Sequence, residues 1–236
     1  MSFLFLAALT CLISGAFFWS GCRVAEERLP ETLNVAAGPI ILPPPAHDSN
    51  VSLEKALFTR VSRRDFSDQP LTLDTAGQIL WAAQGVNIDG VTGATRTAPS
   101  AGATHPMNIY LVAGNVENLT PGIYRYEHEA HSLRPVLEGD IREDVARAAL
   151  EQQFIAQAPA IIILAAEYGR TTQRYGERGI RYVHMEAGHI TQNIYLQAET
   201  LGLATVAVGA FIDEQLKELM GIESEPLMIM PVGHAE

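Results

Sequence analysis

Both cysteines of this chain, Cys11 and Cys22, lie within the first 22 residues, and no Lys, Arg, Asp or Glu occurs before Arg23. The remaining residues therefore cannot form a disulfide framework or a thiolate zinc site, and they cannot use a cysteine nucleophile. Because 47% of the 236 residues are hydrophobic and only 18% are charged, intrinsic disorder is excluded. Residues 23–236 must fold around an apolar core without covalent cross-links.

The first segment is an uncharged, mostly apolar run over residues 3–21, and a run of about 20 such residues can span a bilayer. Its start lacks the basic residues of a cleaved signal peptide. It ends in Trp19-Ser-Gly-Cys22, which is similar to a bacterial lipoprotein cleavage site. Residues 1–22 are thus predicted to be either an uncleaved membrane anchor or a lipoprotein signal that lipidates Cys22. The flanking arginines favour a cytoplasmic body, whereas a lipoprotein would lie outside, so the membrane face stays open.

Residues 23–50 are predicted to be a linker, since Pro30, Pro39 and the run Pro43–Pro45 favour an extended polyproline conformation. One folded domain is then expected over residues 51–236. The net charge of −11 argues against nucleic acid as a partner, because binding to phosphate backbones needs a basic surface.

Hydrophobic periodicity predicts helices and strands that do not alternate strictly, which indicates an α+β fold with helices packed on a sheet. The apolar run over residues 160–166 has the length of a central strand, and the segment 182–201 is apolar nearly all round, so it is expected to be a buried helix. Thr72 and Gly85 are expected to cap a helix over 73–84. Further helices are expected at 53–59, 143–156 and 213–220, and further strands at 108–113, 123–126, 132–136, 204–210 and 227–232.

The segment Arg60-Val-Ser-Arg-Arg-Asp-Phe66 places three guanidinium groups and a hydroxyl within five positions. Arginine holds phosphate in a bidentate manner, so this cluster is a candidate anion site in an otherwise acidic chain. A solvated basic turn is the alternative. Two loops rich in small residues, 99–106 and 208–211, would let a planar ligand approach the backbone.

His184, Glu186 and His189 do not predict a metal site. The two histidines are five residues apart, which places them about 140° apart around a helix, and the remaining pair does not make a complete ligand set. We expect all three to be buried, hydrogen-bonded groups.

Taken in order, several segments resemble the FMN-dependent nitroreductase superfamily, most closely its SagB-type dehydrogenase branch. The similarity covers residues 52–234, and no single motif carries it alone. The matching segments are Ser62–Phe66, Leu80–Gly85, Arg96–Ala103, Pro121–Tyr126, Tyr175–Gly179, Glu186–His189 with Gln192 and Asn193, Leu201–Leu203, Val208–Phe211 and Pro231–Gly233.

The resemblance implies a mixed β-sheet sandwiched by helices, in an intertwined homodimer with FMN at the interface. Arg60, Ser62 and Arg64 match the positions that bind the FMN phosphate and the pyrimidine edge of the flavin. The loop Pro99, Ser100, Ala101 and Gly102 matches the segment that covers the isoalloxazine of the partner subunit. Gly209 and Ala210 match the backbone that meets flavin N5.

Two departures from the family pattern bear on the site. Only His234 stands near the C-terminus where the family often has a basic residue for the phosphate. Arg174 precedes Tyr175 where azoline-oxidising members carry lysine, and arginine is a poor general base. Tyr175 is therefore the candidate acid or base.

These features predict an FMN-dependent oxidoreductase that moves hydride through flavin N5 on a small-molecule substrate. It would be either a reductase supplied by NAD(P)H or a dehydrogenase that oxidises its substrate. The alternative class is a non-enzymatic flavin-binding or partner-scaffold protein of the same fold.

Overall fold

One sheet of seven strands organises the computed structural model, which describes residues 38–87 and 96–236. The spatial order is β1-β4-β3-β2-β5-β7-β6, and every ladder between these strands is antiparallel. An isolated parallel bridge joins Leu71 to Val116. The strands are β1 (Ile40–Ile41), β2 (Met107–Ala113), β3 (Gly122–Glu127), β4 (Ser132–Glu138), β5 (Ala160–Ala166), β6 (Leu203–Thr205) and β7 (Glu225–His234).

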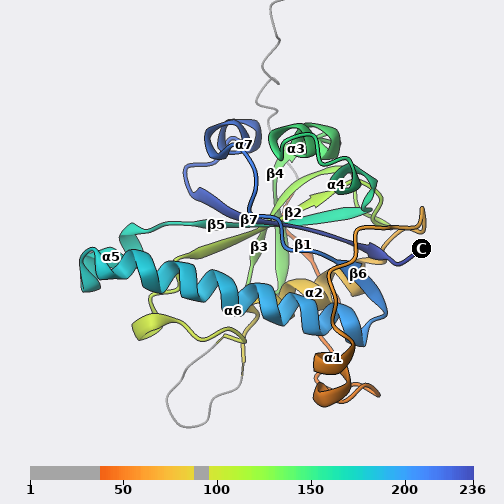
Figure 1. Ribbon diagram of the computed structural model, residues 1–236, viewed down its shortest axis with the longest axis horizontal. Coiled ribbons are helices and arrows are strands. Elements are labelled where there is room, and N and C mark those ends of the chain that lie inside the picture. The colour runs from red at the N-terminus through yellow and green to blue at the C-terminus, as the bar shows by residue number, and fades with distance from the viewer. Residues whose placement is uncertain (1–37, 88–95) are drawn as a thin grey trace, which may run out of the picture. The chain divides into compact units, whose positions relative to one another are not determined.

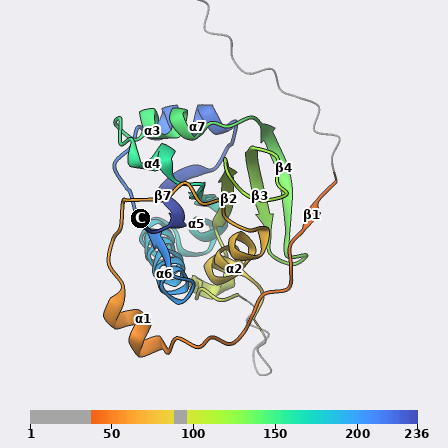
Figure 2. The same ribbon diagram turned by 90° about the vertical axis from the view of Figure 1, so that its right-hand side faces the viewer.

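Helices cover both faces of this sheet (Figure 1). On one face lie α3 (Arg142–Ala148), α4 (Phe154–Gln157) and α7 (Asp213–Met220). On the other lie α2 (Leu73–Gln84) and α6 (Arg178–Thr200), as the turned view also shows (Figure 2). The outlying α1 (Leu53–Thr59) and α5 (Gly169–Tyr175) both contact α6. The predicted α+β class, with a sheet sandwiched by helices, is confirmed.

The central strand β5 explains why two helical layers are needed. All seven of its residues are buried. Alternate side chains of a strand point to opposite faces, so Ile162 and Leu164 enter the core under α2 and α6, whereas Ile161 and Ile163 enter the core under α3 and α7. Its neighbour β2 is divided between the two cores in the same way. A strand without a polar face requires cover on both sides.

Local signals set the ends of α2 as predicted. The Thr72 hydroxyl accepts a hydrogen bond from the Thr75 amide at the N-terminus. The helix stops at Gly85, whose own amide still donates to the Trp81 carbonyl. A second cap at Ser52 opens α1 by accepting from the Lys55 amide. These caps satisfy backbone donors that a helix start leaves unpaired.

The prediction of a single helix over residues 143–156 is wrong. The structure breaks it into α3 and α4, because Leu150 and Glu151 adopt left-handed backbone angles, with φ of 59° and 61°. Such angles end a right-handed helix. The hydrophobic periodicity continues across the break because α3 and α4 both pack on the same core.

The expectation that α6 is buried all round is also wrong. Val183, Ile190 and Ile194 are buried on one side of the helix, whereas Ile180 and Met185 are exposed on the other. The helix starts at Arg178, earlier than predicted, and α5 precedes it as a separate element. The helix is thus amphipathic, and its polar face remains open to ligands or partners.

The strand expected over residues 204–210 is shorter in the structure. The ladder of β6 covers Leu203–Thr205, and an isolated bridge between Val208 and Ile229 continues it in the same register. Because β6 lies at the end of the strand order, its outer edge is free to meet the segment after α1.

The chain joins the sheet earlier than the predicted domain start at Val51. Ile40 and Ile41 pair with β4, Leu42 is 3% exposed, and the Ala46 amide donates to the Gln78 side chain at 2.8 Å. The predicted linker therefore ends before Ile40. The expected anchor or signal in residues 1–22 lies outside the described residues. Within residues 38–87 and 96–236, no helix is long and apolar enough to cross a membrane.

Leu42→Ala is expected to lower the free energy of unfolding by about 2–3 kcal/mol, since it removes a buried side chain. Ile41, the neighbouring residue, is 66% exposed, so Ile41→Ala is the matched control and should cost under about 0.5 kcal/mol. Urea unfolding of both variants measures the difference. Equal effects would contradict the assignment of Leu42 to the core.

Candidate functional site

Tyr195 organises a polar cluster near the C-terminal end of α6. Its hydroxyl lies 2.9 Å from the Ser62 hydroxyl and accepts a hydrogen bond from the Ala207 amide at 2.8 Å. The Arg60 guanidinium lies over the Tyr195 ring, 5.1 Å from its centre. One buried tyrosine thus connects the segment after α1, helix α6 and the stretch that follows β6.

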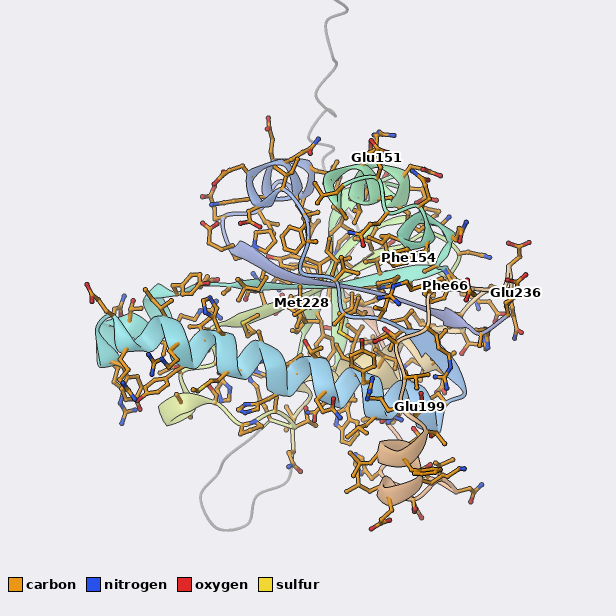
Figure 3. The ribbon with its side chains drawn as sticks, viewed as in Figure 1. Phe66, Glu151, Phe154, Glu199, Met228 and Glu236 are labelled. Atoms are coloured by element: carbon orange, nitrogen blue, oxygen red, sulfur yellow. The ribbon has the colours of Figure 1, made fainter. Side chains whose placement is uncertain are left out.

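The three arginines of the basic segment differ in their pairing. Arg63 forms an ion pair with Glu199 on α6, which is labelled in Figure 3. The backbone amide of Arg63 donates to the Thr205 carbonyl. Burial opposes ionisation of Glu199, but hydrogen bonds from Arg63 and Thr59 hold the pKa of its carboxyl below the ordinary value. Arg60 and Arg64 form no ion pair with any described residue. Their charges remain available for an anion.

The basic segment and the end of β7 enclose a hollow of about 400 Å³. Phe66 bridges to Ala235, and the Ser67 amide donates to the His234 carbonyl. The His234 backbone thus pairs with the chain just after the arginines, and its contact with a phosphate stays a prediction. Carboxylates also line this hollow, from Asp65 and from Glu236, which Figure 3 labels at the far end of the chain.

Gly209 and Ala210 lie further along the same sheet edge. Thr205 pairs with Val232 in β7, and Val208 pairs with Ile229 in the same register. Gly209 is four residues after Thr205, which corresponds to a distance of about 13 Å along an extended chain. Neither Gly209 nor Ala210 donates its amide hydrogen to a described backbone or side-chain acceptor. A methyl group added to Gly209 would meet nothing within 4 Å. The backbone here is open to a ligand.

The loop Pro99–Gly102 lies elsewhere, against α5. Gly102 has a φ of 57°, and an added Cβ would lie 2.4 Å from the Tyr175 hydroxyl. The Arg174 guanidinium donates to the Gly102 carbonyl at 3.1 Å. The positive φ favours glycine at this position, and an added Cβ would also displace the ends of the Tyr175 and Arg174 side chains. The loop and Tyr175, which were separate candidates in the sequence, are therefore in contact in the structure.

The predicted site residues thus form two clusters at different points along α6. Tyr175 stacks edge-on against Tyr182, whereas Arg60 stacks on Tyr195. Tyr182 and Tyr195 are separated by about 20 Å of helix. The structure brings Arg60, Ser62, Arg64, His234, Gly209 and Ala210 to one edge of the sheet. The loop Pro99, Ser100, Ala101 and Gly102 runs from His189 in the middle of α6, which Pro99 contacts, to Tyr175 just before the start of α6, which Gly102 contacts.

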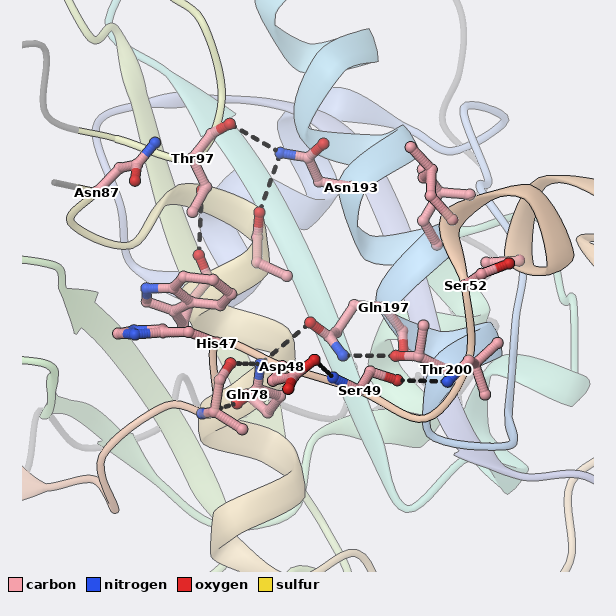
Figure 4. Close-up of a pocket in the computed structure, with 17 residues that line it drawn as sticks. His47, Asp48, Ser49, Ser52, Gln78, Asn87, Thr97, Asn193, Gln197 and Thr200 are labelled. Atoms are coloured by element: carbon pink, nitrogen blue, oxygen red, sulfur yellow. Dashed lines mark hydrogen bonds between the residues drawn. The ribbon is translucent and has the colours of Figure 1, made fainter. Parts of the chain in front are cut away.

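A separate hollow of about 570 Å³ between residues 46–56, α2 and α6 contains none of these residues (Figure 4). Its polar groups bond to one another. Gln78 bonds to Ala46 and Gln197, and Asn193 donates to the carbonyls of Ala82 and Thr97. These bonds tie the segment before α1 to the two helices.

Comparison with known proteins agrees with this arrangement. The family model described as the nitroreductase family matches residues 57–234. A Methanocaldococcus jannaschii protein assigned as a nitroreductase is 47% identical over 183 residues, which cover 78% of this chain and 91% of that protein. The chain belongs to the nitroreductase family.

Solved structures place the fold in the same nitroreductase family. A Ralstonia eutropha protein assigned as a nitroreductase has 30% identity and a TM-score of 0.73, covering 87% of this chain and 93% of its own. A chain of the Escherichia coli microcin synthetase McbBCD complex has 21% identity and a TM-score of 0.64, covering 86% and 79%. The NADPH:FMN oxidoreductase of Vibrio harveyi has 19% identity and a TM-score of 0.56, covering 78% and 69%. The last two share the fold alone.

A partly buried polar cluster lies behind the loop, and of its members only the burial of Glu186 was predicted. Glu186 accepts a hydrogen bond from Gln84 at 3.1 Å, and Arg96 lies 2.8 Å from the His128 ring nitrogen. Burial raises the pKa of Glu186, against hydrogen bonds from Ser100 and Gln84 and the charge of Arg96. Burial and the charge of Arg96 lower the pKa of His128. Through Ser100, Glu186 contacts the loop in this nitroreductase-family fold.

The expectation that His184, Glu186 and His189 are all buried is correct for Glu186 and wrong for both histidines, which are exposed. His184 bonds to the Tyr168 hydroxyl at 2.6 Å, and His189 lies 3.3 Å from the Pro99 carbonyl. Within the described ranges, no group of three or more His, Cys, Asp and Glu could hold a metal ion.

Sequence reasoning missed Tyr195 and Glu199, which hold the basic segment in place. Both are single polar residues on a helix, and no local motif marks them. Only the spacing of four residues between them, which places both on one face of the helix, gives a signal. Their partners Ser62 and Arg63 are more than 130 residues away.

His105→Asn is expected to make stability less sensitive to acid. Burial and the charge of Arg96 lower the pKa of His105 to about 4, and its Nδ1 is buried without a partner among the described residues. The unfolded chain therefore binds a proton between about pH 6.5 and pH 4 that the folded chain does not, so stability falls as the pH drops through this window. The loss should be about 1–2 kcal/mol after solvent screening is allowed for.

Urea unfolding at pH 7 and pH 4.5 measures this difference, and asparagine suits the left-handed angle at position 105. His184→Asn is the matched control, because the His184 side chain is exposed. An unchanged pH dependence in His105→Asn would contradict the assignment.

Proposed function

We propose that this nitroreductase-family protein is an FMN-dependent oxidoreductase of the SagB or nitroreductase type, acting on a small-molecule substrate. The observation that carries the proposal is the pairing of the basic segment. Glu199 neutralises Arg63, whereas Arg60 and Arg64 on either side have no ion-pair partner within residues 38–87 and 96–236. Two free guanidinium groups in a chain of net charge −11 are suited to a phosphate. The name of the Vibrio harveyi fold neighbour states that FMN is its partner.

The residues present fit FMN in charge and shape. Arg60 and Arg64 would hold the phosphate, and Ser62 would offer its hydroxyl beside them. Asp65 and Glu236 add negative charge to the hollow that Ser62 and Arg64 line, whereas Arg60 lies over the Tyr195 ring beside that segment, so we expect phosphate binding to depend on both arginines. The open backbone at Gly209 and Ala210 would donate amide hydrogens to a planar ring. When bound, FMN supplies a centre that accepts or donates hydride.

Tyr175 would move the proton that accompanies hydride transfer. Its hydroxyl lies against Gly102, next to the Arg174 guanidinium. A phenol hydroxyl at this position can donate or accept a proton. Arg174 holds the loop through the Gly102 carbonyl.

We further propose a homodimer that unites the two clusters. They lie about 20 Å apart along α6, so a site that contains both needs a second copy of the chain. Leu53, Leu57 and Phe58 on α1 are large apolar side chains exposed to solvent, and such patches mark interfaces. Sedimentation equilibrium should give twice the 25.6 kDa chain mass. A monomer would contradict the shared site.

Residues 1–22 are proposed to attach the protein to a membrane, as an anchor or as a lipoprotein signal. Their uncharged, apolar composition supports this. Cell fractionation of the full chain and of residues 23–236 tests attachment, which the shorter chain should lose. Cys22→Ser separates the alternatives, because it abolishes attachment only if Cys22 carries the lipid.

The second candidate is a non-enzymatic flavin-binding or scaffold protein. The fold shared with a chain of the microcin synthetase complex favours it, because that chain belongs to a multi-protein assembly. The two candidates differ in whether bound flavin exchanges electrons with a donor.

The purified protein is expected to be yellow and to release FMN on denaturation, and Arg60→Ala should weaken FMN binding. Loss of a charge-assisted hydrogen bond to phosphate costs about 1.5–3 kcal/mol, a Kd increase of about 10- to 100-fold. Fluorescence titration with FMN measures it, and the exposed Arg147 on α3 gives the control Arg147→Ala. A colourless protein that FMN cannot reconstitute would refute the cofactor. Unchanged Kd would refute the phosphate assignment.

Anaerobic addition of NADPH is expected to bleach the flavin absorbance if the protein is a reductase. In a dehydrogenase, the flavin would instead be bleached by the enzyme's own substrate, and NADPH would not bleach it. Stopped-flow absorbance measures the rate of flavin bleaching. The Arg147→Ala variant is again the control and should bleach at the rate of the native protein. Flavin that no donor reduces would support the scaffold candidate.

A further inference from the structure

A second group of basic residues surrounds Tyr175. Arg170 and Arg174 lie on α5, and Arg178 and Arg181 lie on the first turns of α6. These are four of the 16 basic residues of the chain, brought together at the end of α6 opposite to Arg60. Because the net charge of the protein is −11, this group locally reverses the prevailing charge.

The four arginines differ in how far they are already engaged. Arg170 pairs with Glu167, and Arg174 donates to the Gly102 carbonyl. Arg178 and Arg181 form no ion pair with a described residue. These last two are the free charges of the group.

Arg178 is held in a defined position. Its Nε donates to the Tyr182 hydroxyl at 3.2 Å, and its guanidinium lies 5.9 Å from the centre of the Tyr182 ring. The Tyr182 ring meets Tyr175 edge-on at 5.1 Å. The two Nη groups of Arg178 donate to no described residue. A guanidinium fixed through one nitrogen loses less freedom when the other two bind a ligand.

Arg178 and Arg181 line a hollow of about 590 Å³ together with Glu177, Ile180 and His184. The hollow lies on the side of α6 away from the core, where Ile180 is exposed. Glu177 is its one carboxylate, against two guanidinium groups. The Ile180 side chain adds an apolar surface. An apolar body with an anionic group matches this combination of charge and surface.

We infer that this hollow binds the substrate of the proposed reaction through an anionic group, a carboxylate or phosphate held by Arg178 and Arg181. The inference rests on the proposed function, because it assigns Tyr175 as the neighbouring acid or base. Arg178 lies over the Tyr182 ring and that ring contacts the Tyr175 ring, so the hollow neighbours the proposed acid or base. Charge-assisted bonds to arginine would orient the substrate there, and the overall negative charge of the protein would repel anions elsewhere.

Three ligands of similar size test this inference on the full chain: 4-nitrobenzoate, 4-nitrophenyl phosphate and the neutral 4-nitrobenzyl alcohol. Calorimetric titration at low salt measures binding and needs no flavin turnover. Both anions, or the one of the preferred chemistry, should bind about tenfold tighter than the alcohol, equivalent to about 1.4 kcal/mol. The double variant Arg178→Gln/Arg181→Gln should lose this preference and keep its affinity for the alcohol.

The control is the double variant Arg134→Gln/Arg147→Gln, which makes the same change in net charge on β4 and α3. It should keep the preference for anions. Equal binding of all three ligands by the native chain would overturn the inference. So would a preference that survives Arg178→Gln/Arg181→Gln, because the anion would then bind elsewhere, for instance at Arg60.

Turnover of the same nitro compounds separates this inference from the proposed function. In the flavin-loaded protein, kcat/KM for the anions should fall about tenfold in Arg178→Gln/Arg181→Gln and stay unchanged for the alcohol. Selective anion binding without flavin reduction would contradict the proposed oxidoreductase function but would still support the anion site. Normal reduction of all three without an anion preference would refute the anion site alone.

Discussion

The burial of both faces of β5 is the constraint on which the rest of the structure depends. A strand of seven apolar residues, divided between two cores, leaves no polar face for solvent, so the sheet must be covered twice. On one side the cover is α2 and the 23-residue α6. Because α6 is about 35 Å long, its two ends meet different loops. The two clusters of candidate residues follow from this length.

Charge pairing distinguishes these clusters from the rest of the surface. Elsewhere arginines such as Arg125, Arg134, Arg142 and Arg147 lie beside carboxylates, and exposed pairs of this kind contribute little to stability. At the two ends of α6, one arginine of each group is paired with a carboxylate, while Arg60 and Arg64 at one end and Arg178 and Arg181 at the other form no ion pair with a described residue. Glu199 holds Arg63, and Glu167 holds Arg170. The paired member fixes the backbone, and its free neighbours keep their charge for a ligand.

Much of this fold could be predicted because local physics determines it. The central strand, the Thr72 cap and the Gly85 stop depend on a few adjacent residues, and the structure has all three. The helix over 143–156 failed because left-handed angles at Leu150 and Glu151 break it, and neither residue type signals such a break. The linker boundary failed because the pairing of Ile40 with Leu133 depends on a partner far along the chain. Tyr195 could not be recognised as the centre of a site, since its role comes from Ser62 and Ala207.

The separation of the clusters has a consequence for how the protein would work. In the proposed arrangement each end of α6 would face a different ligand group, a phosphate at Arg60 and Arg64 and an anionic substrate at Arg178 and Arg181. Since one helix carries both ends, a homodimer that places the start of one α6 near the end of the other would complete two equivalent sites at once, as a two-fold axis requires. Substrate bound near Tyr175 of one copy would then react at the flavin held by the other. The polar, partly exposed face of α6, unexpected from its composition, is what makes such an arrangement possible.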